Sequence, residues 1–159
     1  MISDLAPQHH AQLLRINSEF VYWLSPLGPS ELAYLLERAS YARQIDNGAG
    51  VLIGYAHDVD FPDHDNLEWL RARLDDFFYI DRVIIDAAAQ GRGLGRKLYA
   101  DVENFARVRG HAWLACEVNR RPNNPGSHAF HLRQGFTPLG EQVFPNSGTA
   151  VRYYAKPLN

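Results

Sequence analysis

Apolar and polar positions alternate along the chain in a way that predicts short helices and strands following one another. Apolar residues three and four positions apart predict helices over about residues 6–22, 30–39, 67–75, 93–109 and 126–134. After a short first strand at the N-terminus, runs rich in β-branched and aromatic residues predict strands at Tyr41–Ile45, Val51–Val59, Phe77–Ile85, Ala112–Asn119, Phe136–Phe144 and Thr149–Lys156. The pattern therefore predicts about seven strands and five helices.

The order of these elements predicts an α/β fold. The strands 77–85 and 112–119 flank the long helix 93–109, so they should run parallel and be joined by a right-handed crossover. The last two strands are expected to form an antiparallel hairpin. No repeat or low-complexity tract interrupts the sequence, so residues 1–159 are expected to form one domain.

Composition and charge narrow the function classes. The chain has 159 residues, of which 46% are apolar and 21% charged, as in an ordinary globular protein. Sixteen basic residues against 18 acidic ones give a net charge of −2, which argues against a nucleic-acid binder. No apolar run is long enough for a membrane span and no secretory signal is recognisable, so a cytoplasmic protein without membrane contact is expected. A single cysteine, Cys116, leaves no pair for a disulfide or a cysteine-based zinc site.

The segment Gln90-Gly91-Arg92-Gly93-Leu94-Gly95-Arg96-Lys97 lies between the strand 77–85 and the helix 93–109. Three glycines in five residues allow a ligand to approach the backbone closely, and the first helical turn offers unpaired N–H groups and the positive end of the helix dipole. This combination predicts a phosphate site, to which the basic side chains add donors. The spacing fits neither the Walker loop nor the dinucleotide fingerprint Gly-x-Gly-x-x-Gly. A glycine-rich turn that merely starts the helix is the alternative.

The stretch Gln90-Gly91-Arg92-Gly93-Leu94-Gly95 resembles the Gln/Arg-x-x-Gly-x-Gly/Ala signature of the GNAT acyl-CoA N-acyltransferases. The segment 124–136, which ends in Gly135-Phe136, is similar to the second motif of that family. The resemblance is specific over about residues 77–157, whereas the first 60 residues agree only in element order. It implies a mixed, twisted sheet with helices on both faces, in which the strands 77–85 and 112–119 splay apart to leave a cleft for acetyl-CoA.

The resemblance also assigns residues to the cosubstrate. It implies that N–H groups from Gly91 to Arg96 bind the pyrophosphate and that the backbone of Val83 and Ile85 pairs with the pantetheine arm. No metal is expected. The residues expected to bind acetyl-CoA are Val83, Ile84, Ile85, Gln90, Gly91, Arg92, Gly93, Leu94, Gly95, Arg96, Lys97, Asn124, Ser127 and Phe130.

His131 stands where many members of the family carry a tyrosine that protonates the departing thiolate. An imidazole can donate a proton near neutral pH, so the resemblance makes His131 the candidate acid. Packing against the cofactor arm is the alternative for this residue.

Asp81 and Glu117 are the candidate bases, because carboxylates inside apolar strands need a partner or a function. Strict alternation places Asp81 on the same side of its strand as Tyr79, Val83 and Ile85. For each carboxylate the alternative is an ion pair with a neighbouring arginine.

The resemblance implies direct attack of a primary amine on acetyl-CoA in a ternary complex. A small, amino-acid-like acceptor is expected, since the acidic stretch 58–68 attracts a cationic amine and Arg82, Arg120 or Arg121 would bind its carboxylate. Acetylation of a protein N-terminus or lysine is the alternative within the family, and a non-catalytic acyl-CoA sensor is the alternative from another class. The exposed edge of the last hairpin leaves a homodimer open. The residues expected to contact the acceptor are Tyr22, Trp23, Tyr79 and Asn119.

Overall fold

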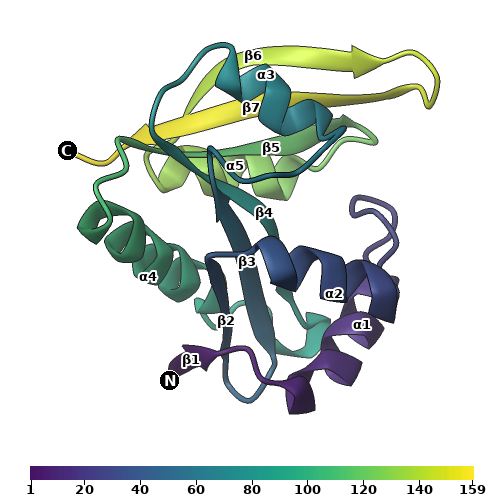
Figure 1. Ribbon diagram of the computed structural model, residues 1–159. Coiled ribbons are helices and arrows are strands. Elements are labelled where there is room, and N and C mark those ends of the chain that lie inside the picture. Colours follow the sequence, from purple (N-terminus) through teal and green to yellow (C-terminus); the bar gives the residue numbers. More distant parts are fainter.

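The computed structural model describes residues 1–159 and contains one seven-stranded sheet (Figure 1). In spatial order the strands are β1-β2-β3-β4-β5-β7-β6. All neighbouring strands are antiparallel except β4 and β5, which confirms the predicted mixed sheet and α/β class. The strands are β1 (Ile2–Asp4), β2 (Tyr41–Ile45), β3 (Gly50–Ala56), β4 (Phe77–Ile85), β5 (Trp113–Arg121), β6 (Thr137–Phe144) and β7 (Thr149–Pro157).

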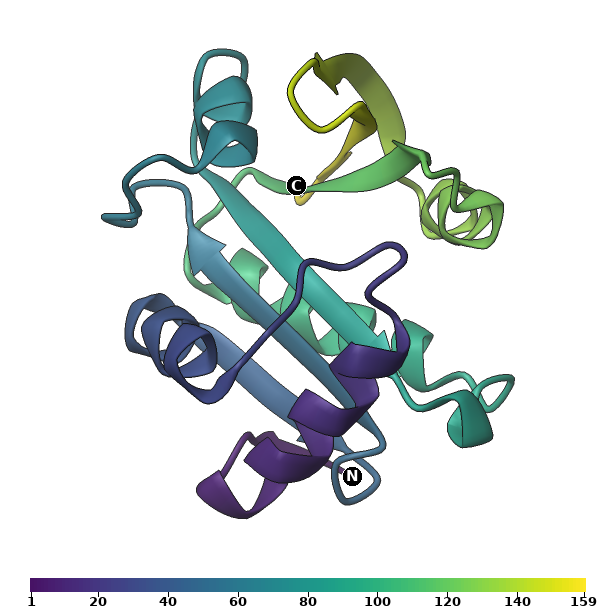
Figure 2. The same ribbon diagram turned by 90° about the vertical axis from the view of Figure 1, so that its right-hand side faces the viewer.

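Helices cover both faces of this sheet, as expected. Figure 2 shows α1 and α4 on opposite sides of the strands. One core forms beneath α4, around Leu98 and Val102, and the other lies beneath α1 to α3, around Leu13, Leu32 and Leu67. No helix combines the length and apolarity that crossing a membrane requires. The helices are α1 (His10–Glu19), α2 (Pro29–Arg38), α3 (Asp65–Arg71), α4 (Leu94–Val108) and α5 (Pro125–Arg133), with short 3-10 turns at Pro7–His9 and Ala87–Ala89.

The first helix is shorter than the predicted range 6–22. The chain leaves α1 at Phe20, whose N–H donates to the carbonyl of Asn17. The buried Asn17 side chain then donates to the Ser25 carbonyl at 3.1 Å, which draws the following loop back towards the helix. This long-range bond has no periodic signal, so the prediction was wrong there. β3 likewise ends at Ala56 rather than Val59, and α3 covers 65–71 rather than 67–75.

β4 contains a bulge that the sequence did not reveal. Gly54 of β3 pairs with Ile80, but the preceding Ile53 pairs with Arg82, so Asp81 is an extra residue in the ladder. A bulge of this kind bends its strand and increases the local twist.

After the bulge, the residues of β4 point to the opposite faces of the sheet from those that strict alternation predicts. Tyr79 lies in the same core as Ile84, whereas Val83 and Ile85 pack against the opposite core. Strict alternation placed Tyr79 with Val83 and Ile85, and that prediction was wrong because the extra residue shifts the period by one.

β4 and β5 pair over three residues only. Their parallel register runs from Phe77↔Trp113 to Tyr79↔Ala115, and no pairing continues beyond it. β4 stays with β3 and β5 stays with β7, so the two strands diverge as Figure 2 shows. The splay implied by the resemblance is therefore present.

Replacing Gly54 by alanine should weaken this part of the sheet. An added Cβ would lie 2.5 Å from Phe78 Cε1 and 2.8 Å from the Tyr79 carbonyl oxygen. We expect a loss of about 1–3 kcal/mol in the free energy of unfolding, measured by urea denaturation. Gly126→Ala is the control, because nothing lies within 4 Å of its added Cβ. Equal midpoints for the two variants would contradict the expected clash.

Candidate active site

A cavity of about 730 Å³ lies between the end of β4, the start of α4 and α5. Most residues expected at acetyl-CoA line it, and Arg92 and Lys97 do not. The predicted residues that line it are Val83, Ile84, Ile85, Gln90, Gly91, Gly93, Leu94, Gly95, Arg96, Asn124, Ser127 and Phe130.

The glycine-rich turn presents free backbone donors to this cavity. Gly91 and Gly93 have φ values of +83° and +75°, a conformation that side chains disfavour. No N–H from Gly91 to Arg96 makes a backbone hydrogen bond, and the first helical bond runs from Lys97 N to Gly93 O at 3.1 Å. Such a turn at the N-terminus of a 15-residue helix can bind an anion. Of the basic side chains here, Arg96 lines the cavity and Arg92 pairs with Asp46 at 2.5 Å.

A second cavity, of about 110 Å³, lies between β4 and β5 beyond the end of their pairing, a region that we call the fork. Asp81 and Glu117 both line it, and it shares Val83, Ser127 and His131 with the larger cavity. The structure therefore brings both candidate bases beside the predicted cofactor cleft.

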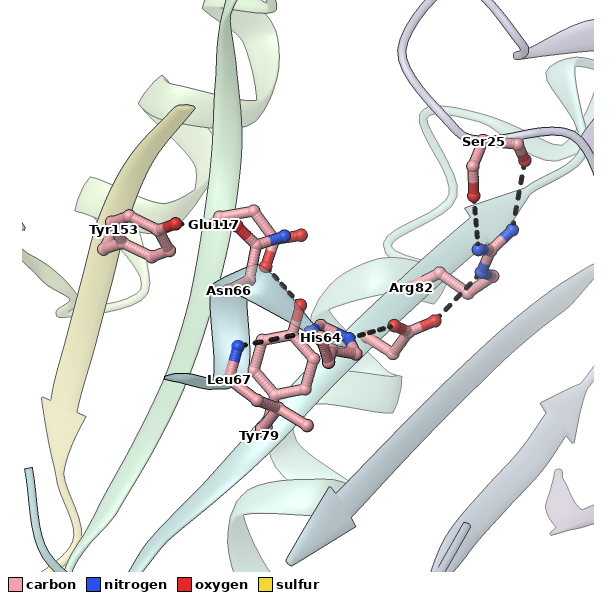
Figure 3. Close-up of polar contacts among 9 residues, drawn as sticks. Ser25, His64, Asn66, Leu67, Tyr79, Arg82, Glu117 and Tyr153 are labelled. Carbon is pink, nitrogen blue, oxygen red and sulfur yellow. Dashed lines mark hydrogen bonds and ion pairs between the residues drawn. The ribbon is translucent and has the colours of Figure 1, made fainter. Parts of the chain in front are cut away.

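Glu117 accepts a short hydrogen bond from the Tyr79 hydroxyl across the fork (Figure 3). Burial raises the pKa of Glu117 to about 7, although the bond from Tyr79 acts in the opposite direction. A carboxyl group with this pKa exchanges protons near neutral pH, which suits a general base.

Asp81 sits in a different environment. Its Oδ2 accepts from Arg82 Nε at 3.1 Å, and its Oδ1 lies 3.6 Å from His64 Nε2. His64 Nδ1 accepts from Leu67 N, so the proton of the ring lies on Nε2 and faces Asp81 (Figure 3). Burial opposes ionisation, but His64 and Arg82 hold the pKa of Asp81 below its usual value. The ion pair considered as the alternative is therefore present at Asp81.

His131 is buried, with 3% of its surface exposed, and both ring nitrogens are engaged. Nδ1 lies 2.7 Å from the Ser127 carbonyl, which can only accept, so Nδ1 carries the proton. Nε2 therefore accepts from the Tyr99 hydroxyl at 2.7 Å. Burial lowers the pKa of His131 to about 4, so the ring is neutral at pH 7. This geometry does not suit the acid predicted for the position, because a neutral ring with an occupied Nε2 has no proton directed at the cleft.

The four residues expected at the acceptor separate into two groups. Trp23 and Asn119 line the small cavity, and Asn119 Nδ2 donates to the Trp23 carbonyl at 2.5 Å. Tyr22 is 66% exposed and lines neither cavity, and Tyr79 is fully buried and touches the site through Glu117.

Tyr99 and Arg133 also line the site and were not predicted. Tyr99 borders both cavities and Arg133 borders the larger one. Tyr99 lies on the apolar face of α4. The sequence pattern therefore indicates a core residue at this position and gives no signal of a site residue. No group of three or more His, Cys, Asp or Glu side chains is arranged to hold a metal ion.

Comparisons with known proteins bear on the family and the fold of this chain. The family model described as "Acetyltransferase (GNAT) family" matches residues 11–136. No curated protein matches the chain significantly in sequence.

Several solved structures share the fold. The ribosomal-protein-S18-alanine N-acetyltransferase of Escherichia coli is 18% identical, with a TM-score of 0.70 over 100% of this chain and 94% of that chain. An N-acetyltransferase of Staphylococcus aureus Mu50 is 16% identical, with a TM-score of 0.73 over 100% and 98%. The protein yncA of Salmonella typhimurium, solved with its cofactor acetyl-CoA, is 19% identical, with a TM-score of 0.72 over 100% and 94%.

The neutral, buried His131 should make stability depend on pH. Its folded pKa of about 4 lies below the unfolded value of about 6.5, so the folded state binds fewer protons and loses stability as the pH falls between these values. Relative to His131→Asn, the wild type should lose about 2 kcal/mol of unfolding free energy between pH 7 and pH 5. Urea denaturation of both proteins at the two pH values measures this difference. Parallel losses would show that folding does not lower the pKa of His131.

Proposed function

This chain belongs to the acetyltransferase (GNAT) family, and we propose that it transfers an acetyl group from acetyl-CoA to the primary amine of a small acceptor by direct attack. The observation that carries the proposal is Glu117, a carboxyl group with a pKa of about 7 in a small cavity beside the larger cleft. The 110 Å³ of that cavity suits a small amine better than a folded protein surface.

Acetyl-CoA supplies the thioester that the amine attacks. The free N–H groups from Gly91 to Arg96 would hold its pyrophosphate, and Arg96 and Arg133 would add charge along the same cleft. Beyond Tyr79 the edge of β4 that faces the cleft has no strand partner, so its N–H and C=O groups are free for an extended amide chain.

Glu117 would accept the proton that the attacking amine must lose. An ammonium group is not nucleophilic, so a base beside it contributes directly to the rate. Asp81 suits this role less well, because its ion pair with Arg82 favours the charged form and leaves it a weak proton acceptor. We therefore assign the base to Glu117.

His131 and Cys116 would serve the site without exchanging a proton or an acyl group. His131 holds the Tyr99 hydroxyl at the wall shared by the two cavities. Burial raises the pKa of the Cys116 thiol, which makes it a poor nucleophile and favours the direct route over an acetylated cysteine.

Gly93→Asp should abolish most of the affinity for acetyl-CoA. The substitution adds a negative charge where the pyrophosphate would lie, and we expect at least a tenfold rise in the dissociation constant measured by calorimetry. Gly148→Asp is a matched control, because Gly148 has a φ of +73° and lies in the distant β6–β7 turn. Unchanged affinity in Gly93→Asp would exclude the turn as the pyrophosphate site.

Glu117→Gln should lower turnover by about 100-fold or more, since the amide cannot accept a proton. Thiol release from acetyl-CoA measures turnover over a panel of small amines, peptides and intact proteins. In the wild type kcat/KM should rise with pH through about 7, as Glu117 loses its proton, and this rise should disappear in the variant. The exposed Glu68 on α3 supplies the control Glu68→Gln.

The alternatives have distinct outcomes in the same assay. If peptides or proteins are acetylated and no small amine is, the acceptor is a peptide or protein amine instead of a small molecule. Binding of acetyl-CoA without thiol release for any amine would indicate a non-catalytic sensor.

A further inference from the structure

The charges around the small cavity restrict which amines can enter it. Its ionisable lining residues are Asp81, Arg82, Glu117, Cys116, Tyr99 and His131. His131 is neutral at pH 7, so Arg82 is the only cation that borders the space beside Glu117.

Arg82 is occupied by the protein itself. Its Nε donates to Asp81, Nη1 donates to Asn17 Oδ1 at 2.8 Å and Nη2 donates to Ser25 Oγ at 2.9 Å. Asp81 neutralises its charge from 3.1 Å, and Figure 3 shows the guanidinium directed towards Ser25 rather than Glu117. Arg82 therefore ties the α1–α2 loop to β4 and has little charge left for a ligand.

No other arginine can take this place. Arg120 pairs with Glu141 at 2.8 Å and borders neither cavity. Arg121 is exposed at the end of β5 and also borders neither. Arg96 and Arg133 line only the larger cleft.

A carboxylate next to the reacting amine would thus enter without a counter-ion. In an α-amino acid it is attached to the carbon that bears the nitrogen, so it must follow the amine into the small cavity. There it would meet the Glu117 carboxylate, which is ionised when it acts as a base, and both groups would be largely removed from water. Like charges in such a site repel strongly, and an unpaired buried charge is costly.

We propose that the acceptor carries no carboxylate on the carbon bearing its amine, so that the enzyme acetylates small amines and refuses the corresponding α-amino acids. The inference rests on the proposed function and replaces the amino-acid-like acceptor expected from the sequence. The ion pair between Asp81 and Arg82 is the feature that sets this specificity.

Matched pairs of acceptors test the proposal. Thiol release would be measured with tyramine and tyrosine, tryptamine and tryptophan, and phenethylamine and phenylalanine. For every pair whose amine is acetylated, we expect kcat/KM to be at least 100-fold lower for the amino acid than for the amine. Tyrosinamide, which has the bulk but not the charge, should stay within about tenfold of tyramine.

The variant Asp81→Asn tests the cause. Without its partner Asp81, the charge of Arg82 becomes available to the carboxylate of tyrosine. The KM for tyrosine should therefore fall, and the ratio of kcat/KM for tyramine to kcat/KM for tyrosine should fall at least tenfold. Equal rates for the members of a pair, or rejection of tyrosinamide together with tyrosine, would overturn the inference and leave the proposed function intact. If no small amine of the wider panel causes thiol release, the proposed function is overturned, and this inference with it.

Discussion

The divergence of β4 from β5 is the constraint on which the rest of the structure depends. Their pairing stops at Tyr79↔Ala115, while β4 remains bonded to β3 and β5 to β7. The bulge at Asp81 lies just beyond that point, and the extra twist it introduces turns β4 away from β5. Both cavities follow from this single break, because each is bordered by residues of β4 beyond it.

The fork also determines how two buried carboxyl groups behave. Asp81 has an arginine and a histidine as partners, and its charged form is favoured. Glu117 has only the neutral Tyr79 hydroxyl, so burial dominates and raises its pKa to about 7. The same residue class therefore supplies a structural ion pair on one side of the fork and a group able to exchange protons on the other.

The α1–α2 loop closes the site by bonds to both arms of the fork. Ser25 is held by Arg82 of β4, whereas the Trp23 carbonyl accepts from Asn119 of β5 and Trp23 Nε1 donates to the Asn123 carbonyl at 3.0 Å. Trp23 consequently borders both cavities although it lies about one hundred residues from its partners in the sequence. The shape of the small cavity thus depends on a loop whose own sequence has no regular pattern.

The sequence by itself determined the order and type of the elements and the glycine-rich turn at the start of α4. β4 and the glycine-rich start of α4 were predicted because strand composition, helix periodicity and glycine content act over a few neighbouring residues. Only the tertiary structure decided the face of Tyr79, the neutral state of His131 and the engagement of Arg82. Each of these depends on an unpaired bulge residue, on burial or on a partner up to 65 residues away, and none of them leaves a periodic signal.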